Sequence, residues 1–374
     1  MNVSILSRLL SMFQSAPAAA VVPTTNASRA STDESAPSAY DERVAREIQT
    51  FSNQLDVHQL PKIFHYWSHT YLRPILMEFG YAHPEDAYVQ EIARQYEKLG
   101  KGLRIVSLGA GSGDSEVRMA AMLRARGVHE FLIDCVDINP TMAARCAELA
   151  AAAGVTEQVT AHCGDFNRWL PDGEYDVVIA NQSLHHVLEL EHLLDAIRTA
   201  IGATGVFLTC DMIGRNGHLR WPEVMPEHQR FWSELAPANR YNFQLQRMET
   251  EFMDWDCSVE GFEGVRAQEV LPLLIERFAF DTFIGWANLT DNFIDRSFGH
   301  HLNPDDPVHT AFIDRLHARD EQGLLSGEWK PTHLFAVMRR DAAQPTRYWR
   351  NLSPEFSVRQ LEPNERRAPY GLHI

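Results

Sequence analysis

Residues 104–114 read Arg-Ile-Val-Ser-Leu-Gly-Ala-Gly-Ser-Gly-Asp, so three glycines at alternate positions directly follow an apolar run. Glycine allows a sharp turn and leaves no Cβ between the backbone and a ligand, and the start of a following helix offers unpaired N–H groups. A dinucleotide fingerprint would carry its third glycine one position later, where this sequence has Asp114. The pattern therefore predicts a strand, turn and helix that approach an uncharged nucleoside rather than a pyrophosphate.

Three further apolar runs also end in polar residues. Residues 131–137 end in Asp137, Asp165 follows the run 158–163, and Asn181 follows the run 175–180. A carboxylate at the tip of the second strand can accept two hydrogen bonds from a ribose diol and repels a 2′-phosphate. Because parallel strands end at a shared edge, we expect these polar residues to line one ligand-binding edge.

Helical segments alternate with these strands, which is typical of a doubly wound α/β fold with a parallel sheet. After a fifth apolar strand at 205–210, an aromatic-rich insertion spans 212–264. The regular pattern then resumes. The remaining expected elements are helices at 115–125, 141–153, 189–200, 267–277 and 310–321 and strands at 280–289 and 332–340.

Residues 88–340 resemble the class I S-adenosylmethionine-dependent methyltransferases, since the four strand-end motifs occur in the family's order. The resemblance implies a seven-stranded, mostly parallel Rossmann-like sheet, completed by a terminal antiparallel pair, with S-adenosyl-L-methionine as the cofactor. The residues that it implies for cofactor binding are Gly109, Ala110, Gly111 and Gly113 under the methionine part, Asp137 at the ribose, Ile138, Asp165 and Phe166 at the adenine, and Asn181 and Gln182 beside the methyl group.

One position departs from the family pattern. The family usually has an acidic residue two positions before the first glycine, and this chain has Ser107 there. The departure leaves the anchoring of the methionine amino group open, and it favours the alternative of a scaffold that binds the cofactor without transferring methyl.

The sequence divides into four segments. Residues 1–40, dominated by Ala, Ser, Pro and Thr near their end, are predicted to be a disordered arm. Residues 41–100 are predicted to form a helical lid, 101–340 the methyltransferase domain, and 341–374 an extended surface tail. Within the lid, Tyr66 and Trp67 are interpreted as substrate-pocket residues, because an aromatic face attracts a sulfonium. The alternative is that they only pack the helices.

Composition limits the partners. With 34 basic and 50 acidic residues the net charge is −16, which disfavours nucleic acid because phosphate contacts supply most of that affinity. A small molecule or a basic partner fits better, and a homodimer is compatible with the sequence. Five cysteines without a Cys-x-x-Cys pair favour reduced core thiols and a cytoplasmic location. No apolar run approaches the roughly 20 residues that span a bilayer.

Candidate catalytic and substrate residues come from the strand ends and the insertion. His186 and His218 are candidate bases, because a neutral imidazole can take a hydroxyl proton at pH 7. His186 has packing or helix capping as its alternative. Arg215 and Arg220, next to Trp221, are interpreted as a clamp for a substrate carboxylate or phosphate. Their alternative is surface ion pairing with Glu223 and Glu227.

Asp211 and Asn181 together could offer oxygen ligands to Mg²⁺, but such residues more often cap or bridge loops, so no metal site is predicted. The predicted function is methyl transfer to oxygen or nitrogen of a small molecule by in-line displacement, with reacting atoms about 3 to 3.5 Å apart. The alternatives are carbon methylation of a natural-product intermediate, methylation of a basic protein, and the non-catalytic scaffold.

Overall fold

The structure is a computed structural model that describes residues 38–52, 60–259 and 261–361. The predicted disordered arm lies outside these residues up to position 37. Its last residues are described, and helix α2 (Ala39–Ser52) begins there. Tyr40, which the sequence placed in the arm, is therefore helical, and its side chain is buried.

The central sheet has eight strands in the order β10-β8-β9-β5-β4-β1-β2-β3. Strands β1 to β5 are parallel, β9 is antiparallel to β5 and β8, and β10 pairs in parallel with β8. The chain runs outward from β1 through β2 to β3 and then returns to β4 on the other side of β1. Such a switch point opens a crevice at the strand ends where ligands bind. The strands are β1 (Leu103–Leu108), β2 (Phe131–Asp137), β3 (Val159–Cys163), β4 (Val177–Asn181), β5 (Val206–Met212), β8 (Ala279–Trp286), β9 (His333–Arg339) and β10 (Arg347–Tyr348).

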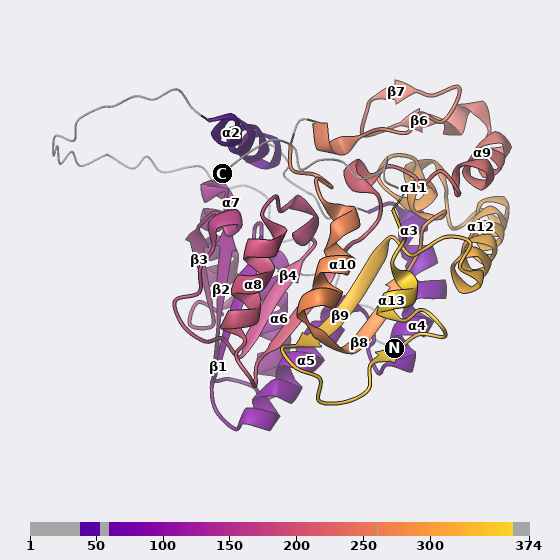
Figure 1. Ribbon diagram of the computed structural model, residues 1–374. Helices are drawn as coiled ribbons and strands as arrows, with labels where there is room; N and C mark the ends of the chain where they lie inside the picture. The colour runs from indigo at the N-terminus through magenta and orange to yellow at the C-terminus, as the bar shows by residue number, and fades with distance from the viewer. Residues whose placement is uncertain (1–37, 53–59, 260, 362–374) are drawn as a thin grey trace, which may run out of the picture. The chain divides into compact units, whose positions relative to one another are not determined.

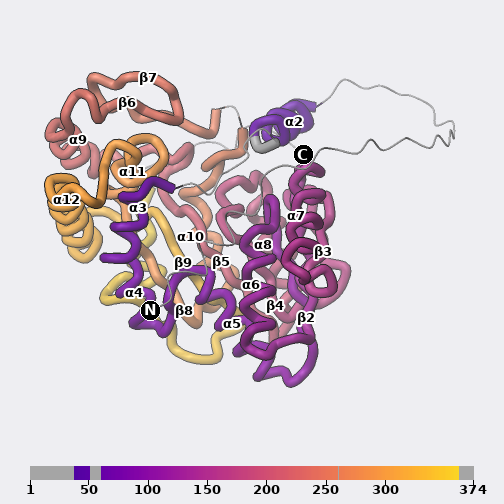
Figure 2. The backbone as a smooth tube through the Cα atoms, turned by 180° about the vertical axis from the view of Figure 1, so that it is seen from behind, coloured from indigo at the N-terminus to yellow at the C-terminus, as the bar shows by residue number. Residues whose placement is uncertain are grey.

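Helices cover both faces of the sheet because successive residues of the inner strands are apolar on both sides. In β1, Ile105 contributes to the core on one face and Val106 to the core on the other. Helices α8 (Leu190–Ala200) and α10 (Ala267–Arg277) cover the face toward the viewer in Figure 1. The opposite face, seen in Figure 2, is covered by α5 (Pro84–Leu99), α6 (Asp114–Ala125) and α7 (Pro140–Ala153).

The insertion and the segments around it build a second layer beyond the carboxyl ends of the strands. It contains the short hairpin of β6 (Tyr241–Asn242) and β7 (Arg247–Met248) and helix α9 (Met225–Glu234), which Figure 1 shows together at the upper edge. The adjoining helices are α3 (Lys62–Trp67), a π-turn (Ser68–Leu72), α4 (Arg73–Glu78), α11 (Asp291–Ile294) and α12 (Pro307–Ser326).

The doubly wound sheet predicted from the sequence is confirmed, with one difference in the tail. Residues beyond 340 were expected to run over the surface, but Arg347 and Tyr348 pair with β8 as an eighth strand, and α13 (Pro354–Ser357) follows. A two-residue strand is too short to show an alternating pattern, so this edge strand could not be predicted from the sequence. None of the described helices combines the length and apolar character needed to cross a membrane.

The cysteines differ partly from the expectation. All five are free thiols, and Cys135, Cys146 and Cys210 are buried as predicted. Cys163 is exposed and Cys257 is only partly buried, because the first ends edge-side strand β3 and the second lies in the insertion.

Candidate active site

The three glycines of the loop after β1 all adopt positive φ angles, 71° at Gly109, 55° at Gly111 and 67° at Gly113. A Cβ at Gly109 would lie 2.5 Å from Ser183, and one at Gly113 would lie 2.2 Å from the Cys146 sulfur. A Cβ at Gly111 would meet no described atom within 4 Å. Gly109 and Gly113 are thus required by packing, whereas the space above Gly111 is open to a ligand.

Asp137, at the end of β2, holds the glycine loop. Its Oδ2 accepts a hydrogen bond from the Gly111 N–H and its Oδ1 accepts one from the Asn139 N–H, each at 2.8 Å. Burial raises the pKa of this carboxyl, and the two backbone bonds partly offset that effect. Each oxygen keeps a lone pair, so the carboxylate can accept further hydrogen bonds at the partly exposed strand tip beside Ile138.

Asp165, after β3, is bonded to helix α2. The Tyr40 hydroxyl donates to Asp165 Oδ2 at 2.7 Å, while Oδ1 accepts from the Asn167 N–H at 2.9 Å. The ring of Phe166 lies 3.4 Å from the position of a Cβ at Gly109. The second predicted acidic position and its aromatic neighbour therefore lie beside the glycine loop, as expected for one binding edge.

Asp211, at the end of β5, organises the turn that follows β4. Its carboxylate is fully buried and accepts hydrogen bonds from the N–H groups of Ser183 at 2.9 Å and Leu184 at 2.8 Å. Asn181 instead accepts from the Tyr88 hydroxyl at 3.2 Å, and Gln182 takes a positive φ of 55°. Asp211 therefore hydrogen-bonds to the turn after β4, and Asn181 hydrogen-bonds to Tyr88, so the two side chains are not arranged as a pair of magnesium ligands.

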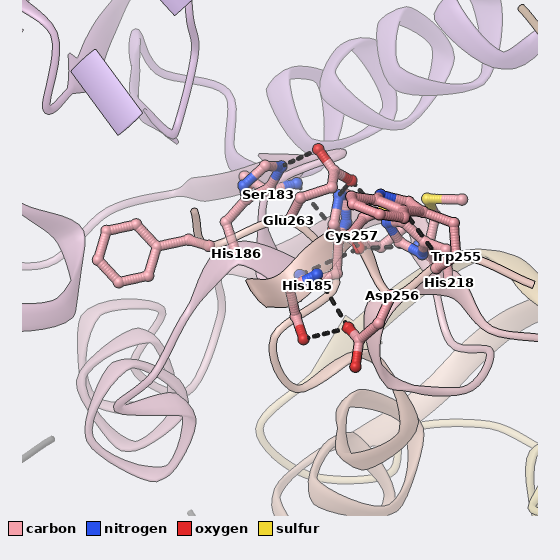
Figure 3. Close-up of polar contacts among 12 residues, drawn as sticks. Ser183, His185, His186, His218, Trp255, Asp256, Cys257 and Glu263 are labelled. Atoms are coloured by element: carbon pink, nitrogen blue, oxygen red, sulfur yellow. Dashed lines mark hydrogen bonds and ion pairs between the residues drawn. The ribbon is translucent and has the colours of Figure 1, made fainter. Parts of the chain in front are cut away.

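A cluster of three histidines surrounds one carboxylate at this edge; we call His185, His186, His218 and Glu263 the histidine cluster (Figure 3). Glu263 Oε1 lies 2.5 Å from His218 Nε2 and 3.2 Å from His185 Nε2, and Oε2 lies 3.6 Å from His186 Nε2. Two elements bring the imidazoles together, the 3-10 turn Leu184–His186 after β4 and the turn Asn216–His218 in the insertion.

The outer nitrogens of two of these imidazoles face other carboxylates. His185 Nδ1 lies 2.7 Å from Asp211 Oδ1, and His186 Nδ1 lies 3.0 Å from Glu47 Oε1 on α2. Each of the two imidazoles therefore bridges a carboxylate outside the cluster and Glu263 inside it. This arrangement fixes the ring orientations.

Burial and charge act against each other in the cluster. Burial alone would lower the pKa of His185, but Asp211 and Glu263 raise it to about 10. Burial lowers the pKa of His218, and Glu263 offsets only part of that effect. For Glu263, the attraction of the histidines outweighs burial and holds the pKa well below the usual range. At pH 7 the arrangement therefore contains an imidazolium, a neutral imidazole and an ionised carboxylate side by side.

Helix α2 closes over this edge. Glu47 Oε2 accepts from the Phe262 N–H at 3.0 Å, and Arg43 Nε donates to the Gly261 carbonyl at 2.8 Å. The Asn139 side chain donates to the Ile48 carbonyl at 3.3 Å. Together with the Tyr40–Asp165 bond, these contacts make α2 a cover over the ends of β2, β3 and β4 (Figure 1). A lid role for the whole segment 41–100 remains a prediction.

The two aromatic residues predicted for the substrate pocket pack against α12. The Tyr66 hydroxyl donates to Asp314 at 2.8 Å, and the Trp67 indole N–H lies 3.3 Å from His317 Nδ1. Trp67 is buried in the core. These contacts match the packing alternative, and a substrate role for them remains a prediction.

The residues of the predicted arginine clamp also contact other side chains, both within the insertion and outside it. Trp221 lies between two guanidiniums, those of Arg215 at 5.8 Å and Arg359 at 4.1 Å from its ring centroid. Arg220 is buried, donates to the His218 carbonyl at 2.6 Å and lies 3.8 Å from Asp291. Arg220 thus supports the turn that carries His218, and substrate binding by these residues remains a prediction.

An acidic side chain does lie beside the serine that departs from the family pattern. The Ser107 hydroxyl donates to Glu116 Oε1 at 2.8 Å, and both residues are buried between β1 and α6. Burial raises the pKa of Glu116. A carboxyl group is therefore present at the base of the glycine loop, although it comes from the helix rather than from the strand.

The comparison with protein families identifies the domain. Residues 105–205, from β1 to the turn before β5, match the family model described as a methyltransferase domain. The chain therefore contains a methyltransferase domain over these residues and resembles the class I S-adenosylmethionine-dependent methyltransferases. This methyltransferase is 22% identical over 246 residues to the 27-O-demethylrifamycin SV methyltransferase of Amycolatopsis mediterranei (strain S699), covering 56% of this chain and 82% of that relative.

Two solved structures are similar to the methyltransferase over most of its length. The geranyl diphosphate C-methyltransferase from Streptomyces coelicolor A3(2), in complex with Mg²⁺, geranyl diphosphate and S-adenosyl-L-homocysteine, has 12% identity and a TM-score of 0.42. That alignment covers 80% of this chain and 98% of the other. The [4+2]-cyclase SpnF has 13% identity and a TM-score of 0.40, with 82% and 98% covered.

Three residues of the candidate site were not predicted from the sequence. Glu263, Glu47 and Tyr40 lie in segments without a recognisable motif, and they reach the strand ends only through tertiary packing. His185 directly precedes the candidate base His186, and its partner Asp211 directly follows the apolar run 205–210. Nothing in their spacing indicated that the two would pair across neighbouring strands.

Proposed function

We propose that the methyltransferase transfers the methyl group of S-adenosylmethionine to an oxygen or nitrogen atom of a small organic acceptor. The observation that carries this proposal is the histidine cluster at the ends of β4 and β5. An acceptor hydroxyl must lose a proton during transfer, and the cluster gathers imidazoles and a carboxylate that can take it.

The cofactor would lie across the strand ends. Space above Gly111, where no described atom lies within 4 Å of an added Cβ, suits the methionine and ribose parts. Asp137 would accept hydrogen bonds from the ribose hydroxyls, and Asp165 with Phe166 would border the adenine, with Ile138 on its face. Gly109, Ala110 and Gly113 would shape the turn, and Asn181 and Gln182 would border the methyl group.

When bound, the cofactor supplies an electrophilic methyl group, so the acceptor atom bonds to the methyl carbon while the carbon–sulfur bond breaks and its electron pair stays on sulfur. The chain's own contribution is to hold the acceptor in line and to receive its proton. His218 suits the second task, since burial lowers its pKa and keeps the imidazole neutral. His186, held by Glu47, is the other candidate.

Two features support an oxygen acceptor in particular. A hydroxyl needs a base more than an amine or an activated carbon does, and this site is rich in bases. The name of the Amycolatopsis relative specifies a demethylated oxygen of a rifamycin. Both favour O-methylation of a natural-product-like small molecule over carbon methylation.

The test uses the full chain with cofactor carrying a labelled methyl group, offered to fractionated small-molecule and protein extracts. We expect label in small-molecule fractions, with the methyl attached to oxygen when the product is analysed by NMR. Label that appears only on protein bands, or tight binding of S-adenosylhomocysteine without turnover on any fraction, would contradict the proposal. The second outcome would support the scaffold alternative.

A further inference from the structure

We propose that His185, His186 and Glu263 bind one divalent transition-metal ion, beside His218. The sequence predicted no metal site, and the inference is independent of the acceptor's identity. It rests on the geometry of the histidine cluster in Figure 3.

The spacing of the ligand atoms fits a single ion. One atom each from His185, His186 and Glu263 lie within 4.8 Å of one another. The Nε2 atoms of the two histidines lie 3.2 and 3.6 Å from the two oxygens of Glu263. In zinc sites, each ligand atom lies about 2.0 to 2.2 Å from the metal, which puts neighbouring ligand atoms about 3 to 3.5 Å apart. Binding therefore requires side-chain rotations that close the wider of these separations.

The outward-facing nitrogens carry the partners that metal-binding histidines usually have. His185 Nδ1 lies 2.7 Å from Asp211, and His186 Nδ1 lies 3.0 Å from Glu47. A carboxylate at one ring nitrogen accepts a hydrogen bond from that nitrogen, so the opposite nitrogen can donate its lone pair to a metal once its own proton has left. The Nε2 atoms of both histidines face Glu263.

A strained turn positions His218 in the histidine cluster. Its φ is 54°, which is uncommon for a residue with a side chain, and it follows Gly217 at φ 65°. A Cβ at Gly217 would lie 2.0 Å from Asp256, and one at Gly264 would lie 3.1 Å from the His218 ring. The neighbouring segments therefore fix the conformation of this turn and hold His218 Nε2 against Glu263.

The carboxylates in and around the histidine cluster favour the binding of a cation. Asp211, Glu47 and Glu263 bring three carboxylates to three histidines, and in the described part of the chain the hydrogen-bond and ion-pair partners of Glu263 are all histidines. Imidazole-rich sets with one carboxylate suit Zn²⁺, Fe²⁺ or Mn²⁺, whereas Mg²⁺ and Ca²⁺ prefer oxygen ligands. The cluster therefore selects a transition metal rather than Mg²⁺.

The test uses the full chain, produced without a histidine tag, stripped with EDTA and titrated calorimetrically with Zn²⁺ and Mn²⁺, and with Fe²⁺ under anaerobic conditions. We expect one equivalent of at least one of these ions to bind, and a hundredfold excess of Mg²⁺ not to compete. Glu263→Gln and His186→Asn should each weaken binding at least tenfold. His129→Ala, which alters an exposed histidine away from the cluster, should bind like the wild type.

Circular dichroism and S-adenosylhomocysteine binding, measured on the same samples, report whether each variant is folded. Absence of stoichiometric binding for all three ions would overturn the metal site, as would unchanged affinity in folded Glu263→Gln and His186→Asn. Methyl transfer by metal-free protein would leave the proposed function standing on its own. Failure of transfer with the metal bound would affect only that function.

Discussion

Tyr40 donates a hydrogen bond to Asp165 at 2.7 Å across 125 positions of the chain. The bond ties the first described helix to the loop after β3, at the edge where the cofactor is proposed to lie. Because Asp165 is also proposed to border the adenine, cofactor binding and closure of α2 are expected to influence one another.

Replacing Tyr40 with Phe should loosen α2. A hydrogen bond to a charged group contributes about 1.5 to 3 kcal/mol, and its loss should raise the open population of the helix accordingly. Hydrogen exchange followed by mass spectrometry should then show faster exchange for amides of 39–52 and little change in the sheet. Unchanged exchange in α2 would mean that the other α2 contacts suffice to hold the helix closed.

Replacing Asp137 with Ala should weaken S-adenosylhomocysteine binding by about 1.5 to 3 kcal/mol, which corresponds to roughly 10- to 150-fold in the dissociation constant. The carboxylate would lose its bonds to ribose and its grip on the Gly111 N–H. Calorimetry measures the change, with Asp172→Ala at an exposed position as the control. Equal affinities of the two variants would refute the ribose assignment.

Substitutions at two glycines of the loop should distinguish loss of cofactor binding from loss of stability. Gly111→Val places a side chain in open space, so its cost to folding is the backbone strain of a side chain at φ 55°, about 1 to 3 kcal/mol, and the variant should lose cofactor binding. Gly113→Val carries similar backbone strain and also pushes against the Cys146 sulfur, which should lower stability by about 1 to 3 kcal/mol more. Thermal unfolding and calorimetry on both variants check this contrast. Normal binding by folded Gly111→Val would contradict the proposed position of the cofactor.

Replacing His218 with Asn should lower kcat by about 10² to 10⁴ while leaving S-adenosylhomocysteine affinity nearly unchanged, because the imidazole acts on the acceptor's proton. Rate measurements on the identified acceptor test this expectation. His192→Ala, an exposed histidine bonded to the Trp169 carbonyl, serves as the control. A variant that keeps the full rate would leave His186 as the remaining histidine candidate.

His228 should make stability depend on pH. It is fully buried among Trp232, Phe252 and Phe293, and burial, with a smaller contribution from Arg220, lowers its pKa to about 3. The unfolded chain binds a proton at this histidine near pH 6.5, but the folded chain does not. Neutral His228 therefore costs no stability above pH 6.5. Below that pH, the free energy of unfolding falls by about 1.4 kcal/mol per pH unit as the pH decreases toward 3.

Urea unfolding at pH 7.5 and pH 5.0 measures this effect. The wild type should lose about 2 kcal/mol more than His228→Leu over that interval, since leucine does not titrate. Equal losses would mean that His228 is protonated in the folded protein.

The order of apolar runs and helical segments was enough to predict the sheet and the strand-end part of the candidate site. Gly111, Asp137 and Asp165 could be found because each lies at the end of a strand or within three residues after it. Strand ends are set by local pattern, and parallel strands bring their ends together by topology alone.

The part of the candidate site formed by α2 and the insertion depends on tertiary packing. Glu263, Glu47 and Tyr40 meet the strand ends from segments far apart in the chain, and β10 joins the sheet through two residues with no pattern of their own. Such contacts depend on how a long insertion and an amino-terminal helix pack, which is decided by the sum of many weak interactions rather than by periodicity.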